Sequence, residues 1–376
     1  MSTLRDIGLA RPDLLRNACL INDQWVRADD ERTIAVNDPA TGDLIALVPR
    51  MGRVETERAI AGAEAALPAW RGRTARHRAA ILRRWADLML THQDDLARLM
   101  TLEQGKPLAE ARGEVLYAAS FIEWFGEEGK RVDGELLQAQ RDGQRMLVLK
   151  QPIGVCAAIT PWNFPAAMIT RKVGPALAAG CTIIVKPAEL TPLSAFALGV
   201  LAQEAGIPAG VLQIMAGESA AIGSVLCESD VVRKLSFTGS TAVGRLLMQQ
   251  CAPTIKKLSL ELGGNAPLIV FDDADLDRAV EGIVASKFRN MGQTCVCANR
   301  IYVQAGIYDE LARRLVKSGR GVARGPWTGT GCHAGAADRW TCARQGAAAR
   351  KPPLPTFCEV RCRSPTPSRA PPPGSH

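Results

Sequence analysis

Strands and helices alternate regularly between residues 154 and 252, and this alternation constrains the fold more than any other feature of the sequence. The four predicted strands are near-continuous apolar runs, as strands buried on both faces of a parallel sheet should be. They read GVCAAIT, TIIVKP, VLQIMAG and VRKLSFTG, and a helical segment follows each of them. Such repetition predicts a doubly wound parallel α/β sheet, which binds ligands at the carboxyl ends of its strands.

The flanking segments add helices, short strands and a hairpin to this sheet. Apolar residues recur at three and four spacing from residue 54 to 129, which predicts helices, and residues 18–50 suggest short strands and turns. Residues 131–151 predict a hairpin about Asp142-Gly143. Beyond residue 252 we expect strands in IKKLSLELGG, APLIVFDDAD and RIYVQAG, and a helix in YDELARRLVKS.

A further long helix is expected from about Leu276. Its buried stripe is formed by Leu276, Ala279, Val280, Ile283, Val284 and Phe288. The pattern then breaks, because residues 318–376 contain no Ile, one Leu and nine Pro and show no periodicity. We expect this last segment to be disordered.

The charge of the chain does not indicate a nucleic-acid partner. The formal net charge is +8, but eight Arg and one Lys against one Asp and one Glu place +7 in residues 318–376. The rest of the chain is nearly neutral and has no basic stripe. No apolar run reaches the length of a membrane helix and the N-terminus does not resemble a secretory signal, so we expect a cytoplasmic protein.

Polar residues follow several predicted strands and should meet at one edge of the sheet. The segments are Thr160-Pro161-Trp162-Asn163, Lys186-Pro187-Ala188-Glu189, Thr238-Gly239-Ser240 and Glu261-Leu262-Gly263-Gly264. Gly239-Ser240 opens a helix and could present backbone N–H groups to a phosphate, although such a pair is more often only a turn. Lys186 and Glu189 could hold ribose hydroxyls, or could equally belong to a solvated loop.

The stretch NMGQTCVCANR places Cys295 and Cys297 one residue apart. The eleven cysteines of the chain show no zinc-site spacing, and most of the others read as small buried side chains. Cys295 follows a long helix and lies among small polar residues, which favours a reactive thiol over a packed one. None of the four histidines lies near a predicted strand end, so a Cys-His pair has little support.

The nearest candidate base for this thiol chemistry is Glu261. An apolar environment would let its carboxylate take a proton near neutrality, although the pattern alone favours a surface glutamate in a turn. Asn163 offers a neutral amide donor, which suits an oxyanion. A thiol, a carboxylate, an amide donor and a dinucleotide-type sheet together suggest oxidation of an aldehyde through a thioester.

Five motifs in this order, PWNFP, KPAELTP, FTGS, LELGGNAP and GQTCVCANR, resemble the aldehyde dehydrogenase superfamily. AAMITRKVGPALAAG and ASKFRNMGQTCVCANR are similar to its succinate-semialdehyde dehydrogenases. The resemblance implies Cys295 as nucleophile, Glu261 as general base, and Asn163 with the Cys295 backbone N–H as oxyanion hole. It implies NAD or NADP as cofactor, bound by residues at the strand ends. These are Thr160, Pro161, Trp162, Asn163, Lys186, Glu189, Gly239, Ser240 and Leu262.

The resemblance also implies a domain organisation and an assembly. Residues 1–130 and 152–261 would form a dinucleotide-binding domain, and residues 131–151 an oligomerisation hairpin. Residues 262–317 would form part of a catalytic α/β domain, whose remainder is not found in the aberrant segment 318–376. Family members form homo-oligomers, but we expect this chain not to assemble normally.

The candidate substrate is succinate semialdehyde, whose far end is a carboxylate. Arg171 and Arg289 are expected near the site, and a guanidinium fork suits a carboxylate, although either could pair with a structural acid instead. Glutarate semialdehyde fits the same charges. The carboxylate of Glu189 would repel a 2′-phosphate, which favours NAD.

The resemblance further implies that Cys297 can form a disulfide with Cys295 and silence it, although Cys297 could equally be a spectator.

Because the catalytic domain is incomplete, the chain could have lost activity. The alternative is then a catalytically inactive dinucleotide-binding or scaffold protein.

Overall fold

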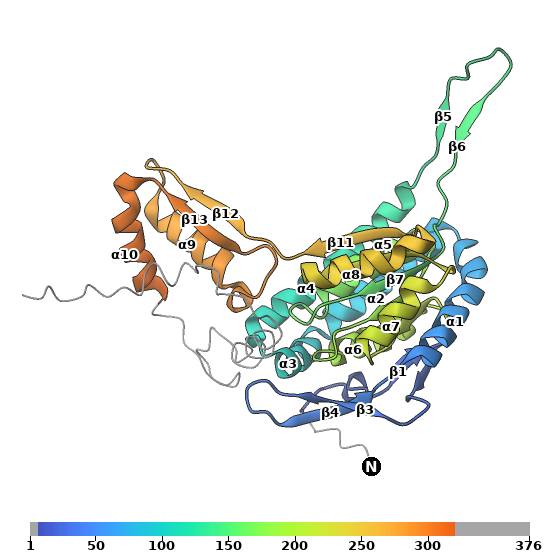
Figure 1. Ribbon diagram of the computed structural model, residues 1–376, viewed down its shortest axis with the longest axis horizontal. Helices are drawn as coiled ribbons and strands as arrows, with labels where there is room; N and C mark the ends of the chain where they lie inside the picture. The colour runs from blue at the N-terminus through green and yellow to red at the C-terminus, as the bar shows by residue number, and fades with distance from the viewer. Residues whose placement is uncertain (1–6, 320–376) are drawn as a thin grey trace, which may run out of the picture. The chain divides into compact units, whose positions relative to one another are not determined.

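The computed structural model describes residues 7–319, which form two compact units, residues 7–263 and residues 264–319 (Figure 1). The larger unit contains a seven-stranded sheet in the order β11-β10-β7-β8-β9-β1-β2. The strands from β11 to β9 are parallel, whereas β1 pairs antiparallel with β9 and with β2. The bounds are β1 Cys19–Ile21, β2 Gln24–Val26, β7 Val155–Ile159, β8 Thr182–Lys186, β9 Leu212–Ile214, β10 Val232–Gly239 and β11 Lys257–Leu262.

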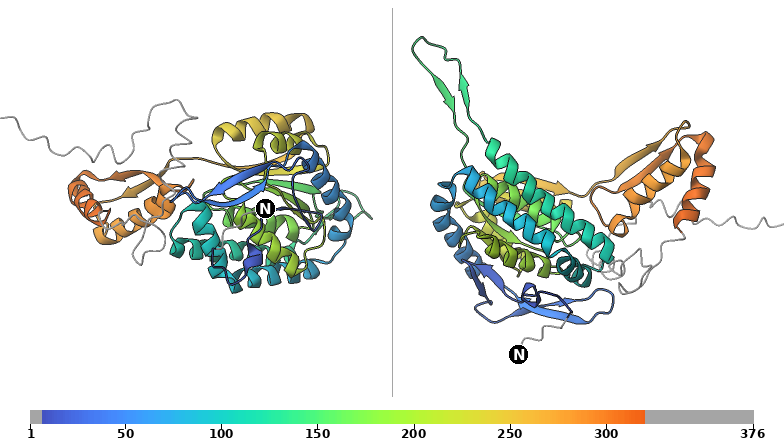
Figure 2. Two further views of the ribbon diagram at one scale, coloured as in Figure 1. Left: turned by 90° about the horizontal axis from the view of Figure 1, so that it is seen from below. Right: turned by 180° about the vertical axis from the view of Figure 1, so that it is seen from behind.

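Helices cover both faces of this sheet, which confirms the predicted doubly wound fold (Figures 1 and 2). One face carries α5 and α6, on which α2, α3 and α4 pack, and the other carries α1, α7 and α8. The bounds are α1 Arg53–Arg71, α2 Ala75–Thr91, α3 Gln93–Gln104, α4 Leu108–Glu128, α5 Ala167–Ala178, α6 Leu193–Ala205, α7 Ser219–Glu228 and α8 Thr241–Cys251. Within residues 7–319 no helix has the length and apolarity needed to cross a membrane.

Two antiparallel strand pairs extend the larger unit. The first joins β3 (Thr33–Asn37) to β4 (Leu44–Pro49). The second joins β5 (Glu135–Leu137) to β6 (Met146–Val148) as the hairpin predicted at residues 131–151. Both strands of this hairpin are exposed along their whole length, so its apolar residues find no cover within the unit.

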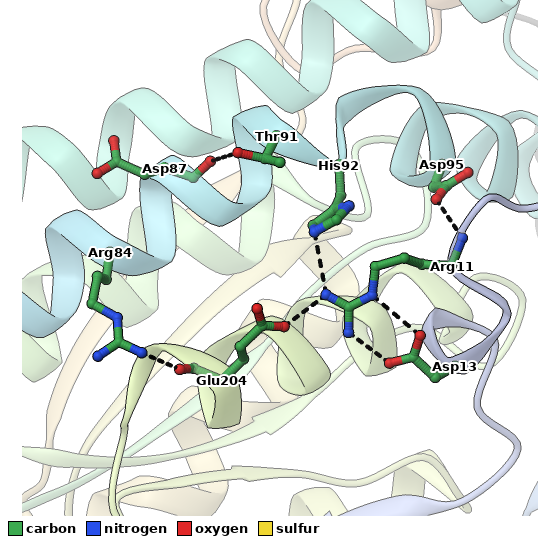
Figure 3. A network of polar contacts seen from close by, with 8 residues as sticks. All are labelled: Arg11, Asp13, Arg84, Asp87, Thr91, His92, Asp95 and Glu204. Atoms are coloured by element: carbon green, nitrogen blue, oxygen red, sulfur yellow. Dashed lines mark hydrogen bonds and ion pairs between the residues drawn. The ribbon is translucent and has the colours of Figure 1, made fainter.

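A polar network attaches the N-terminal segment to the helical layer (Figure 3). The guanidinium of Arg11 donates to Asp13 and Glu204, each at 2.7 Å, and contacts the ring of His92. The backbone amide of Arg11 donates to the carboxylate of Asp95 at 2.9 Å. Contacts with α3, with α6 and with His92 between α2 and α3 therefore hold this segment, although it lies outside the sheet.

The smaller unit is a β-α-β-α arrangement with its own core. Strands β12 (Ala266–Val270) and β13 (Ala298–Val303) are parallel, and α9 (Leu276–Phe288) and α10 (Tyr308–Gly319) pack against them. Asp275 caps α9 by accepting from the amides of Asp277 and Arg278. The buried core consists of Val270, Val280, Ile283, Leu311 and Leu315.

The predicted buried stripe of α9 is correct except at one end. Leu276, Ala279 and Val284 pack against the core, but Phe288 does not belong to it. The chain leaves the helix at this point, because α9 is followed by the short η4 turn (Arg289–Gly292). The expected disordered segment begins at Ser318, and apart from Ser318 and Gly319 at the end of α10 it lies outside the described residues.

A buried carboxylate at the end of α3 caps another helix. The two oxygens of Glu103 accept from the backbone amides of Leu193 and Ser194, at 2.7 and 2.8 Å, in the first turn of α6. Burial raises the pKa of Glu103 to about 7, while the hydrogen bonds from Ser194 and Leu193 oppose that rise. The folded chain therefore holds this proton over a pH range in which an unfolded chain releases it.

This carboxyl predicts a pH dependence of stability. Between about pH 4.5 and 7 the folded state binds more protons at Glu103 than the unfolded state, so the free energy of unfolding falls as pH rises. The contribution is about 3 kcal/mol across the window. Glu103→Gln should flatten this slope in denaturant titrations at several pH values. An unchanged slope would show that Glu103 does not titrate in this range.

Candidate functional site

Four loops leave the sheet of the larger unit at the same edge, because the strands that precede them are parallel neighbours. Ile159 of β7 lies in register with Lys186 of β8 and with Phe237 of β10, and Thr238 lies beside Glu261 of β11. The chain proceeds outward from β7 through β8 and β9, and then returns to place β10 on the other side of β7. A ligand crevice is expected at such a switch in strand order.

A buried lysine, a carboxylate and a hydroxyl converge at the ends of β8 and β9. The ammonium of Lys186 donates to the hydroxyl of Ser219 and lies 3.1 Å from the carboxylate of Glu189. Ser219 in turn donates to Glu189. Burial lowers the pKa of Lys186, with Glu189 opposing the shift. Burial acts against ionisation of Glu189, yet the Lys186 charge and the Ser219 hydroxyl leave the pKa of Glu189 lowered.

The turn Gly239-Ser240 opens helix α8, as the sequence predicts. Ser240 is the N-cap residue, and its hydroxyl accepts from the backbone amide of Val243 at 3.3 Å. A Cβ atom at Gly239 would lie 2.4 Å from the ring of Phe237, so only glycine fits here without movement of the ring. Leu262 packs close to Gly244 in the first turn of α8. The helix N-terminus therefore lies at the site edge beside β11.

The loop after β7 carries Trp162 and Asn163, both partly exposed. The backbone amide of Thr160 donates to the carbonyl of Lys186 at 3.1 Å, which ties the start of the loop to β8. The carbonyl of Asn163 accepts from the ammonium of Lys106 at 2.9 Å. The loop is thus held by Lys186 and Lys106, while Trp162 and Asn163 stay partly exposed and the side-chain oxygen of Asn163 is buried.

Lys172, Thr238 and Glu261 lie in one row at the same edge. The ammonium of Lys172 donates to Thr238 at 2.7 Å, and its charge interacts with the carboxylate of Glu261. Burial lowers the pKa of Lys172 to about 8, helped by the charge of Arg171 and opposed by Glu261. Glu261 itself is exposed on edge strand β11, so the apolar environment considered for it is not found among the described residues.

Arg171 lies on α5, and no acid pairs with it in the described part of the chain. Its guanidinium donates to the hydroxyl of Tyr117 at 2.9 Å and stacks over the ring of Phe121, 4.9 Å from the centroid. Its Nε is buried and finds no hydrogen-bond partner within residues 7–319. This arginine is therefore positioned by aromatic contacts and has donor capacity available for a carboxylate.

The two cysteines of the smaller unit have different surroundings. Cys297 is wholly buried; its sulfur accepts from the hydroxyl of Thr294 at 2.7 Å and contacts the carbonyl of Lys287 at 3.6 Å. Cys295 is partly exposed. Cys297 thus anchors the turn to the end of α9, and Cys295 is the more accessible of the two thiols.

The turn before this thiol has an unusual backbone. Asn290, Met291 and Gly292 have consecutive positive φ angles of 49°, 56° and 78°. The left-handed region is costly for residues with a side chain, and such strain is concentrated at functional sites. Arg289, which starts this turn, is exposed. The strained turn lies shortly before Cys295, so its conformation determines where the chain places this thiol.

The larger unit offers groups that fit a nicotinamide dinucleotide. Lys186 and Ser219 can donate to ribose hydroxyls and Glu189 can accept from them, and the amides of the first turn of α8 suit a pyrophosphate. The hydroxyl of Thr160 is buried at the same edge without a hydrogen-bond partner among the described residues. Within residues 7–319, no three His, Cys, Asp or Glu side chains cluster as metal ligands.

Sequence reasoning missed three residues at this edge. It passed over the end of the third predicted strand, where Ser219 starts the next helix. Lys172 was expected only as part of the helix AAMITRKVGPALAAG, but its ammonium reaches the edge by donating from α5 to the hydroxyl of Thr238. Lys106 follows the helix-ending Gly105, but its contact with Asn163 joins segments 57 residues apart and leaves no local signal.

Comparisons with known proteins place this arrangement in a family. The Aldehyde dehydrogenase family matches residues 25–337. The chain is 62% identical over 322 residues to the glutarate-semialdehyde dehydrogenase of Pseudomonas putida (strain KT2440), covering 84% of this chain and 67% of that protein. It is 64% identical over 303 residues to the NADP(+) succinate-semialdehyde dehydrogenase of Escherichia coli (strain K12), covering 81% of this chain and 63% of the relative.

A solved structure shows the same fold. The crystal structure of an NADP-dependent enzyme of E. coli superposes with a TM-score of 0.87 at 60% sequence identity, covering 87% of this chain and 68% of that one. This chain therefore spans about two thirds of the length of its relatives.

Proposed function

The chain belongs to the aldehyde dehydrogenase family, and on that premise we propose that it oxidises succinate semialdehyde to succinate with a nicotinamide dinucleotide. One structural observation carries the proposal: of two neighbouring cysteines, Cys297 is wholly buried, whereas Cys295 is partly exposed and follows the strained turn at residues 290–292. This is the arrangement that a nucleophile held by a packed neighbour requires.

The residues have distinct parts in the proposed reaction. The Cys295 thiolate adds to the aldehyde carbon, and the amide of Asn163 with the Cys295 N–H donates to the resulting oxyanion. The nicotinamide ring, when bound, supplies the acceptor for the hydride that leaves this carbon. The product is a thioester on Cys295. Glu261 takes a proton from water, whose oxygen attacks the thioester carbon; the carbon–sulfur bond breaks, the acid is released, and Cys295 leaves as the thiolate while Glu261 holds the proton.

Two arginines support an anionic substrate. Arg171, with a buried Nε and no acidic partner among the described residues, would bind the carboxylate of the semialdehyde, and Arg289 would assist it. Glutarate semialdehyde is the second candidate, and the named P. putida relative favours it. The two substrates differ by one methylene, which a pocket distinguishes by only about 1–3 kcal/mol.

The NAD preference expected from the charge of Glu189 is not supported, because the E. coli relative is named for NADP(+). The structure offers a reason, since the adjacent ammonium of Lys186 compensates the carboxylate. We propose that the cluster of Lys186, Glu189 and Ser219 contacts the adenine ribose and sets the balance between NAD and NADP.

Glu189→Gln tests this role. The variant keeps the size of the side chain, removes its charge and leaves Lys186 to attract a 2′-phosphate. The ratio of kcat/KM for NADP to that for NAD should rise about tenfold, equivalent to about 1.4 kcal/mol. Glu218→Gln, an exposed neighbour whose nearest cation is Arg50 at 3.7 Å, should leave the ratio unchanged. An equal ratio in both variants would remove Glu189 from the cofactor site.

Assembly, location and pathway complete the proposal. The exposed hairpin β5–β6 would carry the contact between copies, as in the oligomers of the family, and impaired assembly stays a prediction. A role in GABA degradation would follow from the proposed substrate, and we propose a cytoplasmic location, as expected from the sequence. The alternative is a chain that binds the dinucleotide without turnover, as a scaffold.

One assay separates these readings. The purified chain is incubated with succinate semialdehyde, glutarate semialdehyde or an uncharged aldehyde and with each dinucleotide, while reduced nicotinamide is followed by absorbance. Size-exclusion chromatography of the same sample reports its assembly. Turnover with the two semialdehydes supports the enzyme, whereas dinucleotide binding without turnover supports the scaffold. Faster turnover of the uncharged aldehyde contradicts the proposed substrate.

A further inference from the structure

A buried ion pair beneath the Asn163 loop has no part in the reaction proposed above. Lys106 follows α3 and Glu114 lies in α4, and each side chain is only 1% exposed. The ammonium donates to the carboxylate, and it also lies 4.1 Å from the centroid of the Phe164 ring. Both charges are thus removed from water within the helical layer that supports the site edge.

Each partner of this ion pair holds a different part of one short segment. The Lys106 ammonium donates to the carbonyl of Asn163 at 2.9 Å. The second oxygen of Glu114 accepts from the amides of Ala166 and Ala167, at 3.0 and 3.2 Å, where α5 begins. The segment from 163 to 167 is therefore clamped at both ends by one lysine–carboxylate pair.

Stabilisation of the fold does not by itself explain this buried pair. Removing two charges from water costs free energy that a packed apolar pair would not lose, so a buried ion pair is weak evidence of stabilisation. The pair instead fixes the positions of the backbone groups that it contacts, because charge-assisted hydrogen bonds in a dry environment are short and directional. The lysine holds the carbonyl of Asn163, the residue assigned as oxyanion donor, and the carboxylate holds the backbone three and four residues further on.

We propose that Lys106 and Glu114 are positioning residues that set the orientation of Asn163 toward the reacting carbonyl oxygen. This inference rests on the proposed function for its catalytic consequence, but the clamp itself is independent of activity. A donor displaced by about 1 Å from the developing oxyanion can reduce the rate by on the order of 10²-fold. The two residues act through Asn163 and touch no substrate.

The decisive variant removes both charges together. Either single substitution would leave an uncompensated buried charge and could unfold the chain, whereas Lys106→Met with Glu114→Gln removes the pair at nearly constant volume. The matched control is Arg83→Met with Glu123→Gln, which removes an exposed ion pair of 2.8 Å between α2 and α4. The full chain is used, with thermal unfolding, hydrogen–deuterium exchange of the peptide spanning residues 160–170, and steady-state kinetics as measurements.

The expected results separate a positioning role from a merely structural one. In the double variant the amides of the 160–170 peptide should exchange at least about tenfold faster, while the thermal midpoint stays within a few degrees of wild type. The kcat should fall about 10²-fold with little change in the KM for aldehyde. The control pair should change none of these quantities.

The inference is overturned by unchanged exchange in the 160–170 peptide, by unchanged kcat despite faster exchange, or by an equal loss in the control. If the wild-type chain shows no turnover, that result counts against the proposed function and not against this inference. The hydrogen–deuterium exchange of the 160–170 peptide then decides whether Lys106 and Glu114 hold the segment. An unfolded double variant would also overturn the inference, because it would show that the pair is required for folding.

Discussion

Cys295→Ala is expected to abolish aldehyde oxidation, with kcat at least about 10⁴-fold below wild type. The reason is that the thioester route requires a thiolate that a ligand can reach, and in the described part of the smaller unit only Cys295 is an accessible cysteine. Steady-state production of reduced nicotinamide from succinate semialdehyde measures the loss. Cofactor binding, followed by quenching of tryptophan fluorescence, should remain.

Cys297→Ala, two residues further along the chain, is the matched control. Its side chain is wholly buried and anchors the turn, so the variant should lose some stability but keep most of its activity. If Cys297 forms a disulfide with Cys295 under peroxide, the variant should also resist inhibition by peroxide. Full activity in Cys295→Ala would refute the assignment of the nucleophile, and unchanged peroxide sensitivity in Cys297→Ala would refute the redox role.

Removing Arg171 is expected to damage the oxidation of succinate semialdehyde far more than that of an uncharged aldehyde of similar length. Loss of one charge-assisted contact should cost about 2–4 kcal/mol in kcat/KM, roughly 30- to 1000-fold, mainly through KM. Arg171→Met is preferable to Arg171→Ala, because the longer side chain keeps the packing against Tyr117 and Phe121. Arg289→Ala should have the same direction of effect.

The comparison between substrates makes this test specific. Arg171→Lys should recover part of the loss, since it restores the charge without the fork geometry. Arg58→Ala, which removes an exposed arginine paired with Asp29, should affect neither substrate. Equal losses on the charged and the uncharged aldehyde would show that neither Arg171 nor Arg289 recognises the carboxylate.

The sequence by itself determined the order and type of the secondary structure. Periodicity is a local property, so the alternation from residue 154 to 252 predicted β7 to α8, and the helix signals predicted α9 and α10. The same local logic placed Ser240 at the start of α8, because a serine after a buried strand suits the N-cap position. The parallel arrangement then implied which loops share one edge.

The tertiary structure decided which side chains meet and which stay accessible. The pairing of β10 with both β7 and β11, the clamp of Lys106 and Glu114 on the Asn163 loop, and the convergence of Ser219 on Glu189 join segments distant in the sequence. The different exposure of Cys295 and Cys297, and the exposed position of Glu261 on an edge strand, likewise depend on the neighbours that folding supplies. Such contacts depend on packing between elements, and no local pattern of residue types encodes them.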